Sequence, residues 1–182
     1  MIKNSNWALS HSLPCGVLIH DGEVEELKLP DGQRKTGAIM AKVYYSTVLD
    51  QSADRVWGAI RDFNSYPEWV ESVTESHIEE GKSGDAVGAI RSFVEYGTRI
   101  RQRLLAHSDL ERSYTYESCE PLGAISYYRG TGRVTPIVDG NRAFVEWSVS
   151  VECPAEEQTN CTNLLEKAMP QWLNSLRTVL AG

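Results

Sequence analysis

The stretch that decides the fold is Ala143-Phe-Val-Glu-Trp-Ser-Val-Ser-Val-Glu-Cys153. It alternates with a period of two, so that Val145, Trp147, Val149 and Val151 share one face while Glu and Ser residues occupy the other. Such alternation predicts a β-strand with one buried and one solvated face. A tryptophan within the apolar row either fills a core or contacts a bound molecule, and its N–H needs a partner when it is buried.

Composition bounds the classes of function. The 182 residues are 41% hydrophobic and carry a net charge of −7, which disfavours nucleic acid and anionic membrane surfaces as partners. No apolar run approaches the roughly 20 residues that span a bilayer. The first residues do not resemble a signal peptide, so we expect a cytoplasmic protein without membrane insertion. Four cysteines without CxxC spacing predict reduced thiols, and four scattered histidines predict no metal site.

The N-terminal residues 1–40 form an extension with its own pattern. Residues 16–29 hold two strand-like runs around Asp21-Gly22, which is a tight-turn signal. A lone hairpin is marginally stable. We therefore expect it to dock on the main domain or on a second copy of the chain, which would make a homo-oligomer.

Residues 41–182 predict an α+β domain. A strand (43–49) precedes two short helices, the first capped by Ser52 and the second opened by Pro67. Period-two runs separated by turn signals then predict six further antiparallel strands: 72–79, 86–95, 99–106, 113–118, 125–138 and 143–153. An amphipathic helix (162–181), with Pro170 inside it, closes the chain. Such a helix buries its apolar side across a curved sheet of about seven strands, and the space between them is a natural ligand cavity.

Several motifs resemble the START-like or Bet v 1-like (SRPBCC) superfamily, and within it the polyketide cyclase/dehydrase branch. They are Ala53-Asp-Arg-Val-Trp57, Phe63-x-x-Tyr-Pro-x-Trp69, Gly88-Ala-Ile-Arg91, Ser113-Tyr-Thr-Tyr116 and Val145-Glu-Trp-Ser148. The resemblance covers residues 42–181 and implies a helix-grip fold around a cavity. It leaves function open, because the superfamily includes lipid carriers, receptors, cyclases and lyases.

One member of the superfamily, the plant lachrymatory-factor synthase, allows a residue-by-residue comparison. Its functional arginine corresponds to Arg91, its cavity tyrosine to Tyr128, and its two cavity tryptophans to Trp147 and Trp172. Its essential glutamate corresponds to Gln102. Because glutamine takes no proton at neutral pH, this departure argues against the same acid–base chemistry.

The strand 99–106 indicates which side chains face inward. Arg99, Arg101 and Arg103 share one face and must be solvated, so Gln102 points to the interior. On the preceding strand Arg91 shares a face with Phe93 and is drawn inward with it. A buried arginine needs an acceptor, which Glu95, Tyr128 or a ligand oxygen could supply.

These assignments predict a cavity wall of polar tips among aromatic and aliphatic side chains. Each aromatic residue of this wall could equally be core packing. The catalytic candidates are Arg91, Tyr128 and Glu95, and the predicted ligand-binding residues are Phe93, Gln102, Leu104, Tyr114, Tyr116, Trp147, Val149, Met169, Trp172 and Leu176.

Three functions follow as hypotheses. The first is a module that binds or carries a mostly hydrophobic, partly oxygenated small molecule. The second is a cofactor-independent cyclase, dehydratase or lyase in which Arg91 stabilises an oxyanion and Tyr128 acts as acid or base. The third is a partner-binding protein whose hairpin extends the sheet of another subunit.

Overall fold

The computed structural model describes residues 17–20, 23–26 and 37–182. The chain divides into two units, Met1–Lys35 and Thr36–Gly182. In the first unit, β1 (Val17–His20) pairs antiparallel with β2 (Glu23–Glu26), as expected for the hairpin. That this extension docks on the main domain or joins two copies of the chain stays a prediction, which the solution mass of the full chain and of a chain lacking residues 1–38 would test.

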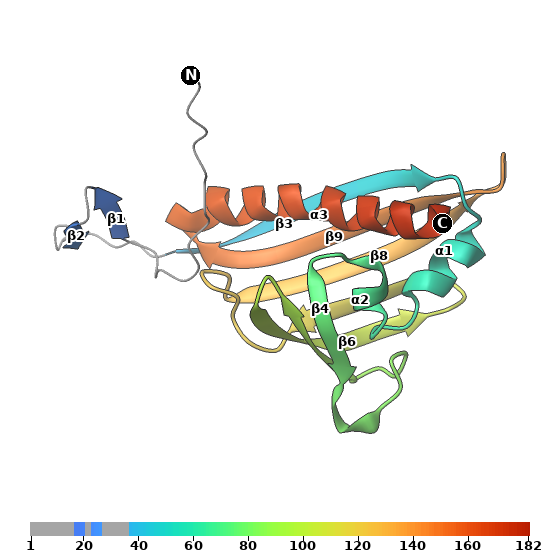
Figure 1. Ribbon diagram of the computed structural model, residues 1–182, viewed down its shortest axis with the longest axis horizontal. Helices are drawn as coiled ribbons and strands as arrows, with labels where there is room; N and C mark the ends of the chain where they lie inside the picture. The colour runs from blue at the N-terminus through green and yellow to red at the C-terminus, as the bar shows by residue number, and fades with distance from the viewer. Residues whose placement is uncertain (1–16, 21–22, 27–36) are drawn as a thin grey trace, which may run out of the picture. The chain divides into compact units, whose positions relative to one another are not determined.

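The second unit is built on one antiparallel sheet of seven strands in the order β3-β9-β8-β7-β6-β5-β4. The sheet curves around a long helix (Figure 1). Its strands are β3 (Ala38–Leu49), β4 (Val73–Ile78), β5 (Ile90–Glu95), β6 (Thr98–Ser108), β7 (Ser113–Ser118), β8 (Tyr127–Ile137) and β9 (Arg142–Pro154).

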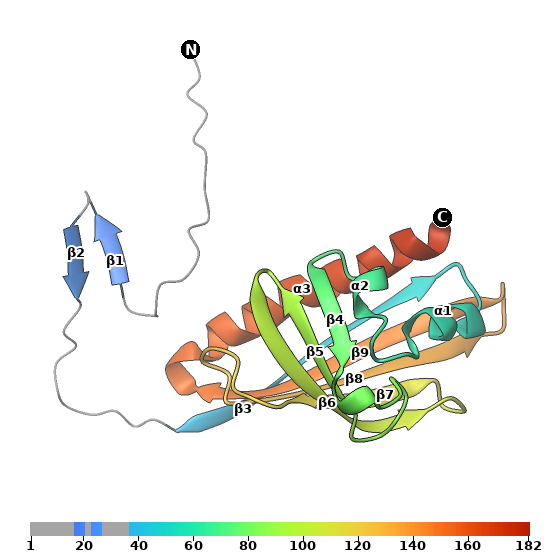
Figure 2. The same ribbon diagram turned by 60° about the horizontal axis from the view of Figure 1, so that its bottom comes forward.

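The long helix is α3 (Gln158–Ala181), which continues through Pro170 as one element. It runs over β3 and β9 (Figures 1 and 2). Two short helices, α1 (Ala53–Ile60) and α2 (Tyr66–Trp69), lie at the C-terminal end of α3. Single 3-10 turns, η1 (Glu79–Gly81) and η2 (Ala155–Glu157), complete the elements. This is the helix-grip architecture expected from the sequence.

Local chemistry explains the ends of these elements. The Ser52 hydroxyl accepts a hydrogen bond from the Arg55 amide at 3.3 Å and caps α1. The strand expected from residue 86 begins only at Ile90, because Gly88 has a φ of +87°. This left-handed conformation breaks an extended strand and favours glycine.

The two faces of the sheet are chemically distinct, as the alternation in residues 143–153 predicted. Every second residue of β9 from Ala143 to Cys153 is buried. On the outer face, Arg99 pairs with Glu75 at 2.8 Å, Arg101 pairs with Glu79 at 2.7 Å, and further carboxylates complete the row. The solvated arginine face expected from the sequence is therefore confirmed, and Gln102 lies on the inner face.

Candidate functional site

A cavity of about 360 Å³ lies between the inner face of the sheet and the N-terminal half of α3. Five residues predicted for the wall line it: Phe93, Glu95, Gln102, Tyr128 and Trp172. The remaining wall comes from α2, from β6, from the β7–β8 connection and from α3, and it includes Tyr66, Ile100, Leu122, Ile125, Cys161 and Leu165. The cavity is thus mainly apolar, with a few polar groups at defined positions.

Arg91 lies behind this wall and not on it. Its guanidinium donates to the Phe63 carbonyl at 2.8 Å and to Gln102 Oε1 at 2.5 Å. The side chain is only 2% exposed, and its Nε has no hydrogen-bond partner among the described residues. The Glu95 pairing considered from the sequence does not form, since Glu95 Oε1 instead accepts from Ser72 and Trp172.

Aromatic rings take the place of a carboxylate around Arg91. Its Cζ lies 3.9 Å from the ring centroid of Phe63, 4.1 Å from that of Tyr66 and 4.9 Å from that of Phe93. Cation–π attraction over several ring faces stabilises a desolvated guanidinium without neutralising its charge. The guanidinium therefore keeps its positive charge and polarises the groups in contact with it. Its polar neighbour on the cavity side is Gln102.

Tyr128 provides the second polar group of the cavity. Its ring lies 6.1 Å from the Tyr116 ring, measured between centroids, and the Tyr116 hydroxyl accepts from Trp147 Nε1 at 3.1 Å. Burial raises the pKa of Tyr128 well above its ordinary value, and burial likewise raises the pKa of Tyr116. Both hydroxyls are therefore protonated at neutral pH and act as hydrogen-bonding groups.

The contacts of Trp147 show that its ring is packed in the core. Besides the hydrogen bond to Tyr116, its ring lies 5.8 Å from the Trp69 ring and 5.6 Å from the Tyr114 ring, measured between centroids. Trp147 is 4% exposed and forms part of the hydrophobic core. The strand β9 therefore fills the core at this point, and the cavity opens farther along the sheet.

The other predicted wall residues also lie in the packed core and do not line the cavity: Leu104, Tyr114, Tyr116, Val149, Met169 and Leu176. The reason is that α1, α2 and the loop between them insert large rings over this end of the sheet. Phe63, for example, lies 5.9 Å from Tyr114 and 5.6 Å from Tyr116. Ligand contact by these six residues and by Trp147 stays a prediction.

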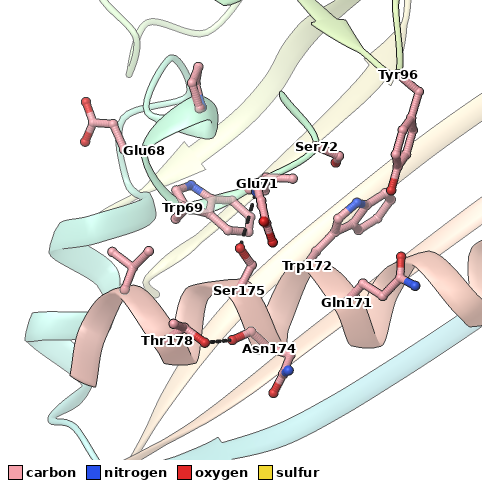
Figure 3. Close-up of a pocket in the computed structure, with 13 residues that line it drawn as sticks. Glu68, Trp69, Glu71, Ser72, Tyr96, Gln171, Trp172, Asn174, Ser175 and Thr178 are labelled. Atoms are coloured by element: carbon pink, nitrogen blue, oxygen red, sulfur yellow. Dashed lines mark hydrogen bonds between the residues drawn. The ribbon is translucent and has the colours of Figure 1, made fainter. Parts of the chain in front are cut away.

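Trp172 separates the cavity from a second, open hollow. This outer groove has a volume of about 850 Å³ and lies between the C-terminal half of α3 and the segment 67–72 (Figure 3). Tyr96, from the turn between β5 and β6, stands beside Trp172 in this view. Because Trp172 lines both spaces and donates to Glu95 at 3.2 Å, its ring is the shared wall between them.

Some cavity residues could have been found from the sequence and others could not. Ile100 shares the face of Gln102, and Leu165 belongs to the apolar stripe of α3, so periodicity pointed to both. Tyr66 lies in a short helix and Leu122 in a loop. Neither position has a periodic signal that predicts which way it faces.

The described residues hold no group of three or more His, Cys, Asp or Glu side chains that could bind a metal ion. Among the helices of the same residues, none is long and apolar enough to cross a bilayer. Of the cysteines, Cys119, Cys153 and Cys161 are free. Burial raises the pKa of Cys161, which lines the cavity, to about 11, so this thiol is protonated at neutral pH.

A sequence comparison matches residues 40–181 to the family described as polyketide cyclase / dehydrase and lipid transport. The chain belongs to this family. The match spans the whole sheet except the first two residues of β3, and all of α3. No match was found among curated proteins.

Several solved structures are similar to this chain. A protein of Nitrosospira multiformis shares 30% identity over 76% of this chain and 94% of its own, with a TM-score of 0.67. The protein XoxI of Bacillus cereus shares 27% identity over 78% of this chain and 96% of its own, with a TM-score of 0.69. Truncated norcoclaurine synthase of Thalictrum flavum, at 13% identity, covers 81% of this chain and 98% of its own with a TM-score of 0.64, which shows a shared fold.

Proposed function

We propose that the protein binds a mostly hydrophobic, partly oxygenated small molecule in the cavity between the curved sheet and α3. The observation that carries the proposal is the cavity itself, whose apolar wall is interrupted by Gln102, Tyr128 and Glu95. Binding sites for small molecules are concave, mainly apolar and fixed by a few polar groups. The family description, which includes lipid transport, is consistent with this role.

The size of the cavity sets the size of the ligand. A volume of about 360 Å³ lies at the lower end of the range of roughly 300–1,000 Å³ for ligand pockets. It suits a molecule of two or three fused rings or a chain of similar volume. A long-chain diacyl lipid would not fit without rearrangement of α3 or of the β7–β8 connection.

Native mass spectrometry of protein purified from its own host tests the proposal, since a retained small molecule adds mass. The variant Ile100→Trp fills the cavity from β6 and is expected to abolish retention of the ligand. Leu110→Trp is the matched control, because Leu110 is 86% exposed and does not line the cavity. Equal retention by wild type and Ile100→Trp would place the ligand elsewhere.

A second candidate function is cofactor-independent catalysis in the same cavity, as a cyclase, dehydratase or lyase. It is favoured by the presence of Glu95 and Tyr128 on one cavity wall. A carboxylate can accept a proton, and the raised pKa of Tyr128 keeps its hydroxyl as a proton donor. Arg91 would act through Gln102 in this scheme, because it does not reach the cavity.

Catalysis and binding are separated by conservative variants. In Glu95→Gln, the amide oxygen can still accept the hydrogen bonds from Ser72 and Trp172, but the side chain cannot accept a proton at neutral pH. Incubation with a small-molecule extract of the host, followed by mass spectrometry, would detect turnover. If wild type forms a product and Glu95→Gln binds the ligand without forming it, the protein is an enzyme. If wild type leaves the metabolites unchanged, the protein is a binding module.

A further inference from the structure

The orientation of the Gln102 amide is determined by its neighbour. A guanidinium has only donors, so the group that faces Arg91 across 2.5 Å must be the amide oxygen. The amide nitrogen then points away from Arg91. Among the described residues no acceptor binds this nitrogen, and it is not enclosed, because Gln102 lines the cavity.

We propose that Gln102 uses this amide N–H group to recognise an acceptor oxygen, a carbonyl or carboxylate, on the ligand. The inference rests on the proposed function, since it assigns the polar end of the molecule bound in the cavity. Phe93, Ile100 and Leu165 surround the remaining volume and contact the apolar body. The ligand is therefore an apolar molecule that carries its acceptor oxygen at the end next to β6.

Arg91 is a positioning residue for this contact. It holds the amide in one orientation, and its buried charge draws electron density toward Gln102 Oε1, which strengthens the amide N–H as a donor. Among residues 17–20, 23–26 and 37–182 it has no carboxylate partner: its acceptors are the Phe63 carbonyl and Gln102, and its Nε is unpaired. A buried cation without a counter-ion also favours electron-rich groups nearby.

Three probes with one naphthalene skeleton test the recognition by calorimetric titration: 2-acetylnaphthalene, 2-naphthoic acid and 2-ethylnaphthalene. The ketone and the acid carry an acceptor oxygen, whereas the ethyl compound has the shape of the ketone without it. We expect wild type to bind the ketone about tenfold more tightly than the ethyl compound, which corresponds to one hydrogen bond to a polarised donor. The acid distinguishes a site for a carboxylate from one for a neutral carbonyl.

Gln102→Glu is the decisive variant because it keeps the shape and the Arg91 contact but replaces the amide N–H₂ with an oxygen. The tenfold preference for the ketone over 2-ethylnaphthalene, a ratio measured within the one variant, should disappear. Arg91→Met, which frees the amide to rotate, should also lose the preference, and Arg91→Lys, which restores a donor-only cation, should recover part of it. In wild type, the Gln102 side-chain N–H signals in a ¹⁵N spectrum should shift with the ketone but not with 2-ethylnaphthalene.

The outcomes separate this inference from the proposed function. If wild type binds none of the three probes, the proposed function fails together with the inference. If wild type binds the ketone and the ethyl compound equally, or if Tyr128→Phe rather than Gln102→Glu removes the preference, the role of Gln102 is overturned while the cavity remains a binding site.

Discussion

Gly130 on β8 offers the sharpest test of the packing that shapes this site. A methyl group added there would lie 2.4 Å from Tyr116 Cζ and 2.5 Å from its hydroxyl oxygen. Ordinary van der Waals contact begins at 3.4 Å, so the Tyr116 ring must move by about 1 Å. That ring is 1% exposed, packs on Phe63 and Tyr128, and holds the hydrogen bond from Trp147.

The magnitude follows from these contacts. Overpacking of a dense core costs about 1–3 kcal/mol, and a ring displacement of this size belongs to the upper half of that range. Loss of the Trp147–Tyr116 hydrogen bond adds about 1 kcal/mol. Replacing glycine by alanine also lowers the conformational entropy of the unfolded chain, which stabilises the folded state by about 0.4–1 kcal/mol. We therefore expect Gly130→Ala to lower the free energy of unfolding by about 2–3.6 kcal/mol.

Urea unfolding followed by circular dichroism measures this change. Gly58→Ala is the matched control, because Gly58 lies in α1 with no atom within 4 Å of the added methyl group, and it should stabilise the protein by about 0.8–1 kcal/mol. In a Tyr116→Val background, Gly130→Ala should lower the free energy of unfolding by less than it does in wild type, because the smaller side chain leaves room for the added methyl group. If Gly130→Ala is as stable as wild type, the close approach of Tyr116 to β8 is refuted.

Three further perturbations test the site and its supports. Arg91→Met leaves Gln102 Oε1 and the Phe63 carbonyl without their donor. It should cost about 2–4 kcal/mol, and by urea unfolding Arg91→Met/Gln102→Leu should cost less than the sum of the single variants. The hydrogen bonds that Arg61 and Trp57 donate to Asp109 lower its carboxyl pKa, so this contribution to stability is present above the unfolded pKa of about 3.9 and is lost as pH falls below it. Asp109→Asn should therefore be destabilised less than wild type on going from pH 7 to pH 2, and an equal loss would contradict the pairing. Trp172→Ala removes the wall shared by groove and cavity, so stopped-flow association of 2-ethylnaphthalene should become faster, and an unchanged rate would mean entry by another route.

The elements of the fold could be predicted from the sequence because their signals are local. Alternation identified β9 and the arginine row of β6, and the periodic apolar stripe identified α3. The position of the cavity along the sheet could not be predicted in this way. Alternation separates the inner face from the outer face of a strand, but it does not tell which inward residues meet a helix and which meet a space.

The sequence by itself determined an antiparallel sheet gripping a helix, the family, and the inward direction of Arg91 and Gln102. Only the tertiary structure decided that Trp147 belongs to the core while Gln102 and Tyr128 reach the cavity. The physical reason is packing between segments distant in the chain. Rings from α1, α2 and the loop between them, such as Phe63 and Trp69, fill one end of the concave face and leave the other end open beneath the N-terminal half of α3.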